Sequence, residues 1–440
     1  MFEEKLRIKG GTSLQGEVKI IGAKNAVLKQ MAAALILPKG KSIIRNVPDL
    51  SDVVAMNEIL TLLGAEVSYE GDVLDIDASN LSSSFVPIEL ARKLRASFVC
   101  LGALVARFKK AQVALPGGCD LGARKVDLHL KGLKALGVKI KEEQGYIFAE
   151  AGRLIGTKIY LDLPSNGATE NIMLAASLAE GETIIENAAR DPEILDLANY
   201  LNSLGCKISG AGTSNIHIEG VELDSLHASD FNCLPDRIEA ATYLIATAMT
   251  SGKVKVKDVL EEDLQALLSK LEDVGVDIKI FPTVNNLVDI LVDSESKTLT
   301  ATDVKTMWYP GFSTDIQPIF SALLAVCKGT STVVENIYNS RFQHLEELNK
   351  MGAKSDINGE VSVITGVSKL KGTQVEGRDL RATAALVVAA LAAEGVSEVR
   401  GLKHLDRGYE HIVEKFKALG ADIERISENN FEQEQSLNLV

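Results

Sequence analysis

The side chain best suited to chemistry stands in a glycine-rich loop. Residues 115–124 read LPGGCDLGAR, so Cys119 follows a Pro-Gly-Gly sequence and lies near Arg124 and Lys125. Neighbouring cations stabilise a thiolate and so favour a reactive cysteine. Taken alone, a glycine-rich loop is as often a simple turn. The remaining cysteines occur in apolar or strand-like contexts and are expected to fill the core: Cys100, Cys206, Cys233 and Cys327.

Cationic residues stand where three alanine-rich helices are expected to begin. Lys24, followed by Asn25, opens the first of these segments, Arg95 opens the second and Arg381 opens the last. The free N–H groups and the dipole at a helix N-terminus attract anions, so a cation there is unfavourable unless an anion binds. The matching positions of the three cations therefore indicate one shared anionic ligand.

Aspartates occupy corresponding places in other copies of the same pattern. Asp236 precedes Arg237, Asp379 stands two residues before Arg381, and Asp315 closes the run Ser-Thr-Asp. A single aspartate at a helix start is most often an N-cap. Because the positions are shared with cations that favour an anion, we expect Asp315 to take part in chemistry.

The elements that position these residues come from an internal repeat. A five-residue pattern occurs as LGAEV, LGVKI, LGCKI, VGVDI, MGAKS and LGADI. Its glycines follow one another at intervals of 68 to 77 residues, and they are Gly64, Gly137, Gly205, Gly275, Gly352 and Gly420. This period is longer than the roughly 20–50 residues of solenoid repeats, so closed packing of the copies is expected.

Each copy contains the same succession of predicted elements. An alanine-rich helix comes first, then a short β-branched strand, then an amphipathic helix that ends at the repeat glycine, and then one or two alternating strands. The alanine-rich helices are apolar on all sides and should be buried, whereas the amphipathic helices should face solvent. Because a scaffold does not define a function, the site must come from the residues that differ between copies.

Length and composition restrict the class of protein. The chain has 440 residues, which favours two domains, and a net charge of −13, which argues against nucleic acid or an anionic membrane as partner. The longest small, apolar segment, residues 382–393, is too short to span a bilayer, and the N-terminus does not resemble a signal peptide. Scattered cysteines and histidines predict reduced thiols, no metal site and a cytoplasmic location.

Seven segments together resemble the enolpyruvyl transferase family. They are GAKNA from Gly22, LPGGCDLGARKVDLHL, LPDRIEAA, PGFSTDIQ, NSRFQHLEELNKMGA, RDLRATAALV and HLDRGYEHI. The resemblance runs from about Leu6 to Arg425, and the PGGC and DRGY segments are typical of the branch that acts on UDP-N-acetylglucosamine.

The resemblance implies an α/β fold of a particular kind. It implies a two-domain inverse α/β barrel built from six βαβαββ units, with three units in each domain. The implied domains are residues 24–231, carrying the Cys119 loop, and residues 1–23 with 232–430. Residues 431–440 are polar and are expected to form a disordered tail.

The resemblance also implies a reaction. Family members of this branch transfer the enolpyruvyl group of phosphoenolpyruvate to the 3′-hydroxyl of UDP-N-acetylglucosamine and release phosphate, which is the first committed step of peptidoglycan synthesis. The reaction needs no metal or other cofactor, and fosfomycin alkylates the loop cysteine of the family. By this resemblance Cys119 is the proton donor and Asp315 faces the attacking hydroxyl.

Substrate contacts follow from the same resemblance. The residues implied for catalysis are Cys119, Asp315, Lys24 and Arg407, and those implied for phosphoenolpyruvate are Lys24, Asn25, Arg124, Arg381 and Arg407. The residues implied for the UDP-sugar are Arg95, Arg124, Lys125, Val126, Asp127, Leu128, Ser165, Asn166, Gly167, Asp315 and Ile337.

The chain departs from the family pattern mainly around the acceptor. Lys125 and Ser313 stand where proline is usual, and Leu163 stands where many members have lysine or an aromatic residue. Asn339-Ser340 replaces the usual acidic-Asn pair before Arg341. Two alternatives therefore stay open, namely a paralogue that acts on another uridine nucleotide and a non-catalytic regulatory homologue. The second is disfavoured because all the implied key residues are present: Lys24, Cys119, Arg124, Asp315 and Arg407.

Overall fold

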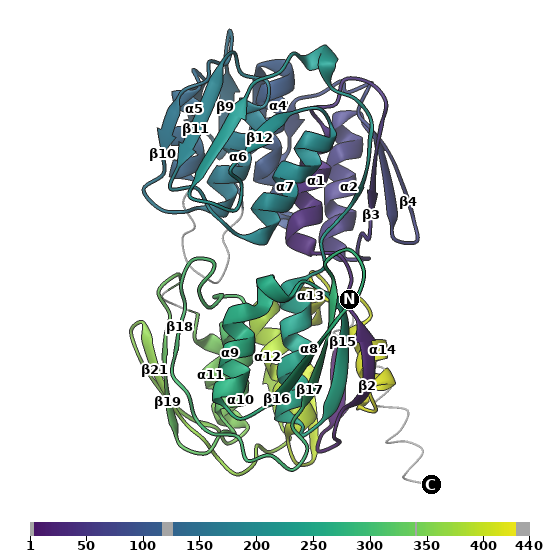
Figure 1. Cartoon of the computed structure of the whole chain (residues 1–440), viewed down its shortest axis with the longest axis vertical. Coiled ribbons are helices and arrows are strands. Elements are labelled where there is room, and N and C mark those ends of the chain that lie inside the picture. The colour runs from purple at the N-terminus through teal and green to yellow at the C-terminus, as the bar shows by residue number, and fades with distance from the viewer. Residues whose placement is uncertain (1–3, 117–125, 339–340, 428–440) are drawn as a thin grey trace. The chain divides into compact units, whose positions relative to one another are not determined.

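The computed structural model describes residues 4–116, 126–338 and 341–427. These residues form two compact units, which are shown in Figure 1. The N-terminal unit contains described residues 21–116 and 126–235, and the C-terminal unit contains described residues 4–20 and 236–427. Each unit is considered by itself below. Cys119, Arg124 and Lys125 lie outside the described residues.

The predicted repeat is confirmed by the sheets. Over the described ranges the chain forms six four-stranded sheets with one common strand order. In the N-terminal unit the sheets are β14-β3-β5-β4, β6-β7-β9-β8 and β10-β11-β13-β12. Their strands are β3 (Lys41–Arg45), β4 (Glu66–Glu70), β5 (Val73–Asp77), β6 (Phe85–Val86), β7 (Lys110–Ala114), β8 (Lys139–Glu143), β9 (Tyr146–Glu150), β10 (Lys158–Tyr160), β11 (Glu182–Glu186), β12 (Lys207–Ser209), β13 (Asn215–Glu219) and β14 (Ser229–Asn232).

The C-terminal unit repeats this order. Its sheets are β16-β17-β15-β2, β18-β19-β21-β20 and β22-β23-β1-β24. The strands are β1 (Glu4–Lys9), β2 (Gln15–Lys19), β15 (Lys253–Val259), β16 (Asp277–Pro282), β17 (Val288–Asp293), β18 (Val304–Lys305), β19 (Thr330–Val334), β20 (Lys354–Asn358), β21 (Val361–Thr365), β22 (Gln374–Glu376), β23 (Val396–Arg400) and β24 (Asp422–Ser427). In each sheet of both units one outer strand pairs in parallel and the other pairings are antiparallel.

Three strands join sheets far from their neighbours in sequence. Strand β2 precedes the first helix of the N-terminal unit but pairs in parallel with β15 of the C-terminal unit. Strand β14 precedes the first helix of the C-terminal unit but pairs in parallel with β3. Strand β1 lies between β23 and β24 and is antiparallel to both. The first and last strands of the described residues, β1 and β24, therefore pair with each other in the C-terminal unit.

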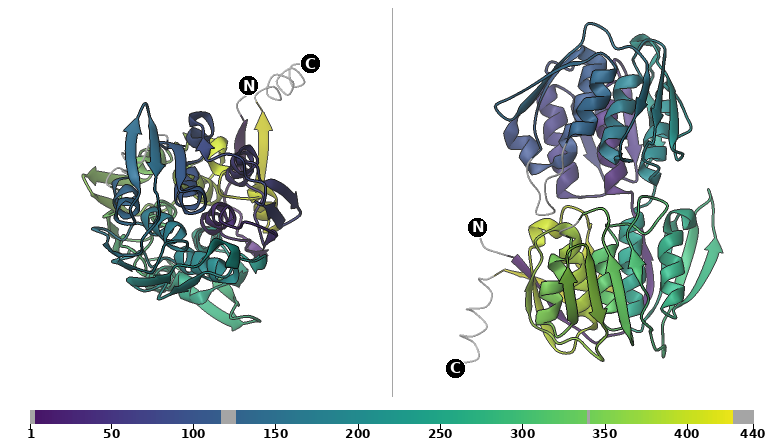
Figure 2. Two further views of the ribbon diagram at one scale, coloured as in Figure 1. Left: turned by 90° about the horizontal axis from the view of Figure 1, so that it is seen from above. Right: turned by 90° about the vertical axis from the view of Figure 1, so that its left-hand side faces the viewer.

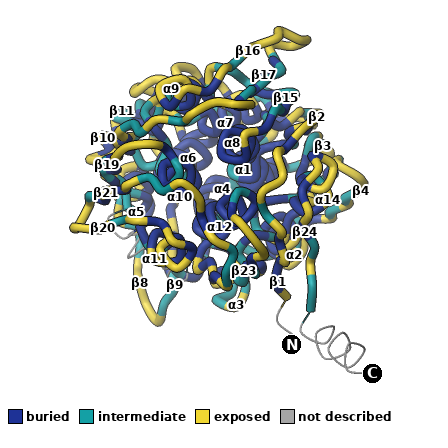
Figure 3. The backbone as a smooth tube through the Cα atoms, turned by 90° about the horizontal axis from the view of Figure 1, so that it is seen from below, coloured by how far each residue is buried: buried dark blue, intermediate teal, exposed yellow. Residues whose placement is uncertain are grey.

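The alanine-rich helices are buried, as predicted. They are α1 (Lys24–Ala34), α4 (Cys100–Phe108) and α6 (Asn166–Ala176) in the N-terminal unit, and α8 (Arg237–Met249), α10 (Gln317–Leu324) and α12 (Leu380–Ala392) in the C-terminal unit. Every residue of α8 and α10 is buried. In each unit the sheets lie outside these helices (Figures 1 and 2), and the tube in Figure 3 shows the helices in dark blue.

The amphipathic helices alternate with the buried ones and expose one face. They are α2 (Ser51–Leu63), α5 (Asp127–Ala135), α7 (Pro192–Ser203), α9 (Gln265–Asp273), α11 (Gln343–Lys350) and α14 (Ile412–Ala418). Two further helices, α3 (Ile88–Lys93) and α13 (Leu402–Leu405), and three 3-10 helices, η1 (Arg95–Val99), η2 (Leu223–Ser225) and η3 (Glu261–Leu264), complete the described elements. None of the helices in the described ranges is long and apolar enough to cross a membrane.

The repeat glycines end the amphipathic helices for a conformational reason. All of them have positive φ, from 92° at Gly352 to 103° at Gly64. A left-handed conformation is costly for residues with a Cβ atom, and glycine is the usual residue just past the last helical turn. The sequence period thus marks the point in each copy where the chain turns from helix to strand.

Alanine at a repeat glycine should destabilise the protein, by an amount that depends on the surroundings. At Gly352 a Cβ atom would meet no atom within 4 Å, so Gly352→Ala should cost only the left-handed backbone, about 1 kcal/mol. Gly64→Ala should cost more, because its Cβ atom would lie 2.8 Å from the Ser82 backbone nitrogen. Urea unfolding of the full chain measures both. Gly352→Asn should be milder than Gly352→Ala, and equal stability of all variants would contradict the explanation.

Candidate active site

Lys24 begins α1 and is a buried cation. Its residue is 9% exposed, and its Nζ atom lies 3.0 Å from Oδ2 of Asp52, which is on α2. Neither an acidic residue in the first turn nor a side-chain cap accompanies this helix start. A buried charge requires a partner, and Asp52 supplies one. The predicted cation at the start of the first alanine-rich helix is therefore in place.

A second cation of α1 follows five residues later. Lys29 lies 3.1 Å from Oε1 of Glu170 on α6, and it donates a hydrogen bond to the backbone oxygen of Asn25. Burial raises the pKa of Glu170, and Lys29 partly opposes this effect. Asn25 itself is half-buried. The start of α1 is thus held to α2 by Lys24 and to α6 by Lys29.

Arg95 does not begin the second alanine-rich helix, and this part of the sequence prediction was wrong. It begins the 3-10 helix η1, which leads into α4. The short helix α3 ends just before it, and Leu94 between them is extended. Arg95 is half-buried, and its charge helps to lower the pKa of His129.

The starts of α5 and α6 meet at His129. The Asn171 amide donates to Nδ1 of His129 over 2.8 Å when the imidazole is neutral. A Cβ atom on Gly167 would lie 2.6 Å from Cε1 of His129, so glycine is required there. Asn171 also accepts a hydrogen bond from the Gly102 backbone nitrogen, over 2.7 Å. One buried asparagine therefore connects α4, α5 and α6.

Six of the predicted UDP-sugar residues of this unit lie at the starts of α5 and α6, whereas Arg95 lies in η1. Val126 is the N-cap residue of α5, and Asp127 and Leu128 begin that helix. Ser165 caps α6 by accepting a hydrogen bond from the Ala168 nitrogen over 3.4 Å. Asn166 is half-buried, and its Oδ1 atom is buried with no hydrogen-bond partner among the described residues.

In the C-terminal unit, Asp315 forms ion pairs with two arginines. Its Oδ1 atom lies 2.7 Å from Arg341, and its Oδ2 atom lies 3.2 Å from the nearer nitrogen of Arg381. Both arginine side chains are 4% exposed, whereas that of Asp315 is 28% exposed. The carboxylate is therefore the accessible end of a buried, positively charged group.

Asp315 differs from Asp236 and Asp379, which occupy corresponding positions in other copies of the repeat. Asp236 caps α8 by accepting from the nitrogens of Ile238 and Glu239, and Asp379 caps α12 in the same manner. Helix α10 instead begins after Ile316, with no side-chain cap. The N-cap interpretation is thus right for Asp236 and Asp379, and Asp315 pairs with arginines.

Arg381 and Tyr409 extend this group into the core. Arg381 lies 3.4 Å from the Tyr409 hydroxyl, which also lies 2.8 Å from that of Thr242. Burial by itself lowers the pKa of Arg381, but Asp315, Tyr409 and Asp236 raise it above the ordinary value overall. Arg381 is therefore a permanent cation in this site.

Two predicted residues lie elsewhere in the unit and one residue was missed. Ile337 follows β19, and its nitrogen donates to Glu335 over 2.9 Å. Arg407 follows α13 and is half-buried. Arg341 is the missed residue, because the sequence analysis gave it no role beyond its place in a family motif. It stands two residues before α11, which is amphipathic, so the pattern of cations at the starts of alanine-rich helices did not indicate it.

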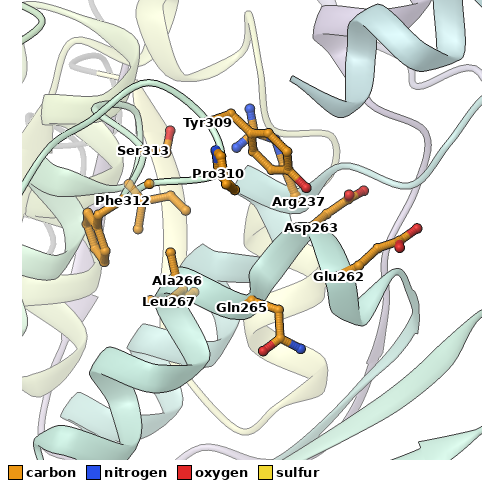
Figure 4. A pocket seen from close by; sticks show the side chains of 12 residues that line it. Arg237, Glu262, Asp263, Gln265, Ala266, Leu267, Tyr309, Pro310, Phe312 and Ser313 are labelled. Carbon is orange, nitrogen blue, oxygen red and sulfur yellow. The ribbon is translucent and has the colours of Figure 1, made fainter. Parts of the chain in front are cut away.

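A small pocket lies beside the segment that leads to Asp315. Its walls come from α8, η3, α9 and residues 309–313, and Figure 4 shows the Tyr309 ring near Arg237. The guanidinium carbon of Arg237 is 5.6 Å from the ring centroid of Tyr309. Ser313, where the sequence departs from the family, lines this pocket.

Within the described ranges no group of three or more metal-ligating side chains occurs.

Comparison with known proteins identifies close relatives. The chain matches the family model described as EPSP synthase (3-phosphoshikimate 1-carboxyvinyltransferase) over residues 8–416. UDP-N-acetylglucosamine 1-carboxyvinyltransferase 2 of Caldanaerobacter subterraneus is 49% identical over 422 residues, covering 96% of this chain and 99% of that protein. UDP-N-acetylglucosamine 1-carboxyvinyltransferase of Nostoc sp. is 47% identical over 437 residues, covering 98% and 96%.

Solved structures of enolpyruvyl transferases have the same fold. The enolpyruvyl transferase NikO from Streptomyces tendae superposes with a TM-score of 0.87 at 27% identity, covering 97% of this chain and all of that one. EPSP synthase from Acinetobacter baumannii superposes with a TM-score of 0.74 at 16% identity, covering 96% and 100%. The second likeness concerns the fold alone.

Cys119 should be the cysteine that reacts with alkylating reagents. The other four cysteines are buried, and burial raises the pKa of Cys100 and Cys327 to about 12 and that of Cys206 to about 11. Iodoacetamide at pH 8, and fosfomycin, should therefore modify one site, to be located by peptide mass mapping. Cys119→Ser should abolish the modification. Labelling of a buried cysteine with Cys119 untouched would refute the assignment.

The buried imidazole of His129 should make the protein sensitive to acid. Burial, Arg95 and Lys29 lower the pKa of His129 to about 3, from an ordinary value of 6.5. Below pH 6.5 the unfolded chain binds a proton that the folded chain excludes, so stability falls until the pH reaches about 3.

His129→Gln removes this titration and provides the test. The variant should be less stable than the wild type at pH 7.5, but the gap should shrink by about 1.4 kcal/mol at pH 5.5. Urea unfolding at both values measures the two gaps. An unchanged gap would mean that His129 is not neutral in the folded protein.

Proposed function

The chain belongs to the enolpyruvyl transferase family, and on this premise we propose that it transfers the enolpyruvyl group of phosphoenolpyruvate to the 3′-hydroxyl of UDP-N-acetylglucosamine. The observation that carries the proposal is the identity of 47–49% over nearly the full length to relatives named for this activity. The comparisons give no support to a paralogue with another acceptor or to a regulatory homologue. The proposed role is in peptidoglycan synthesis in the cytoplasm.

The reaction is an addition followed by an elimination. In the addition the enol methylene gains a proton, and the sugar hydroxyl loses its proton as its oxygen bonds to the adjacent carbon. In the elimination the new methyl group loses a proton. The bond between the adjacent carbon, which now carries the sugar oxygen, and the phosphate oxygen breaks, and phosphate leaves with the bonding electrons. A proton donor and a proton acceptor are required, and the proposed groups are Cys119 and Asp315. No metal or redox cofactor enters this balance.

The arrangement of Asp315 supports its proposed role. It is the accessible member of a group whose two arginines are buried, and it is not used as a helix cap. Its carboxylate is therefore held in place and is still open to a ligand. Arg341 is added to the proposed site because it shares Asp315 with Arg381.

Phosphoenolpyruvate carries a phosphate and a carboxylate, and the chain supplies several cations for them. Lys24 and Arg381 are the proposed ligands that are already buried, and their present partners are the carboxylates of Asp52 and Asp315. Arg124, Arg407 and the neutral donor Asn25 complete the proposal. Guanidinium groups suit this role because they bind carboxylate and phosphate through paired hydrogen bonds.

The UDP-sugar is proposed to bind at the starts of α5 and α6. Helix N-termini present free N–H groups that bind phosphate oxygens, and glycine at position 167 permits close approach of a ligand to the backbone. Asn166 offers a buried amide oxygen without a partner among the described residues, which suits an N–H or O–H donor of the ligand. Arg95 and Lys125 are the proposed cations of this site.

Phosphate release tests the acceptor directly. The protein is incubated with phosphoenolpyruvate and, separately, with UDP-N-acetylglucosamine, UMP or shikimate 3-phosphate. We expect turnover with the nucleotide sugar alone. Turnover of UMP without turnover of the nucleotide sugar would overturn the acceptor and leave the enolpyruvyl transfer standing.

Asp315→Asn should reduce kcat at least ~100-fold, the usual cost of losing a positioned acid or base. Asp303→Asn is the matched control, because Asp303 lies in the same unit and accepts a hydrogen bond from the Thr332 nitrogen over 2.7 Å. The control should keep the wild-type kcat. Equal activity of Asp315→Asn and the wild type would exclude Asp315 from proton transfer.

A further inference from the structure

Glu335 is a buried carboxylate that binds four donors from three segments of the C-terminal unit. It follows β19 and is fully shielded from solvent. Its Oε1 atom accepts from the Thr306 hydroxyl at 2.9 Å and from the nitrogens of Ile337 at 2.9 Å and Tyr338 at 3.0 Å. Its Oε2 atom accepts from the Thr314 hydroxyl at 3.0 Å. The sequence patterns described above did not indicate a role for Glu335.

The hydrogen bond to Thr314 has a direction that matters for Asp315. A carboxylate only accepts hydrogen bonds, so the Thr314 hydroxyl must be the donor in its hydrogen bond with Glu335. The hydroxyl oxygen then accepts from Arg341, whose NH1 atom is 3.0 Å away. The same NH1 atom lies 2.7 Å from Oδ1 of Asp315. A continuous chain therefore runs from Glu335 through Thr314 and Arg341 to Asp315.

Glu335 holds Arg341 from a second side as well. The guanidinium carbon of Arg341 lies 5.5 Å from the ring centroid of Tyr338, the residue whose nitrogen Glu335 binds. Thr314 and Tyr338, two neighbours of the Arg341 side chain, are thus both held by Glu335. The side chain of Arg341 is 4% exposed, so solvent does not compete for these contacts.

We propose that Glu335 is the positioning residue of Asp315, acting through Thr314 and Arg341. The inference rests on the proposed function of Asp315. Because Glu335 is fully shielded from solvent, it acts only through its neighbours. It sets the direction of the hydrogen bond between Thr314 and Arg341, and so the place of the carboxylate that meets the attacking hydroxyl. A displacement of about 1 Å at a catalytic group is enough to lower a rate about 100-fold.

Two pairs of variants test the chain. Thr314→Val removes the hydroxyl and keeps the volume, and Thr314→Ser keeps the hydroxyl. Glu335→Gln replaces one carboxylate oxygen, a hydrogen-bond acceptor, by an NH2 group, a hydrogen-bond donor. Its control is Glu347→Gln, a change at a carboxylate that is 6% exposed and accepts from the Glu376 nitrogen and from Lys350. Each variant is assayed for phosphate release at saturating substrates, and its thermal midpoint is recorded.

We expect kcat to fall about 10- to 100-fold in Thr314→Val and Glu335→Gln and to stay near the wild type in Thr314→Ser and Glu347→Gln. The double variant Thr314→Val with Glu335→Gln should lose no more than the worse single variant, because both break the same chain. Additive losses, or full activity of Thr314→Val, would overturn the inference. If Glu335→Gln does not fold, the two Thr314 variants decide.

The outcome is separable from that of the proposed function. If the wild type turns over and Thr314→Val has the same kcat as Thr314→Ser, the proposed function stands and the inference fails. If the wild type does not turn over, crystal structures of Thr314→Val and Thr314→Ser decide the inference. A shift of the Asp315 carboxylate in the valine variant alone would support it, and an unchanged pair between Asp315 and Arg341 would refute it.

Discussion

The burial of the alanine-rich helices is the constraint on which the site depends. Every residue of α8 and α10 is buried, and in α12 only the first and last residues are not. Backbone groups inside a helix bond to each other, but the first four N–H groups have no partner within it. Lys24, Asp236 and Asp379 stand at these helix starts, whereas polar residues inside the helices, such as Asn171 and Thr242, are held by hydrogen bonds. The start of each buried helix is thus where the scaffold leaves backbone N–H groups for a cap or a ligand.

Charge compensation then fixes the geometry at those ends. Lys24 pairs with Asp52, Lys29 with Glu170, and Lys415 with Glu239, in each case with side chains that are at most 16% exposed. Taking both charges out of water is costly, and removing one partner typically costs about 3–5 kcal/mol. Such pairs are consequently weak contributors to stability but strong determinants of position. The partner carboxylates therefore hold the lysine side chains in place.

The repeats could be predicted from the sequence because their signal is local. Each repeat glycine needs its own positive φ, and each alanine-rich segment is apolar on every side. The exchange of β2 and β14 could not be predicted in this way. Both strands precede a buried helix at the same place in a copy, and nothing in either strand specifies which parallel neighbour it joins. Arg341 was missed because it precedes the amphipathic helix α11 and not an alanine-rich helix.

The different use of equivalent aspartates has a local cause. Asp236 and Asp379 immediately precede the first residue of α8 and α12 and cap them. In α10 the proline at position 318 falls in the first turn, so the helix begins at Gln317 and Asp315 stands one residue too early to be its cap. Proline is favoured there because its missing N–H would have no helical partner. A shift of one residue in the helix start therefore releases this carboxylate from capping and leaves it to the arginines.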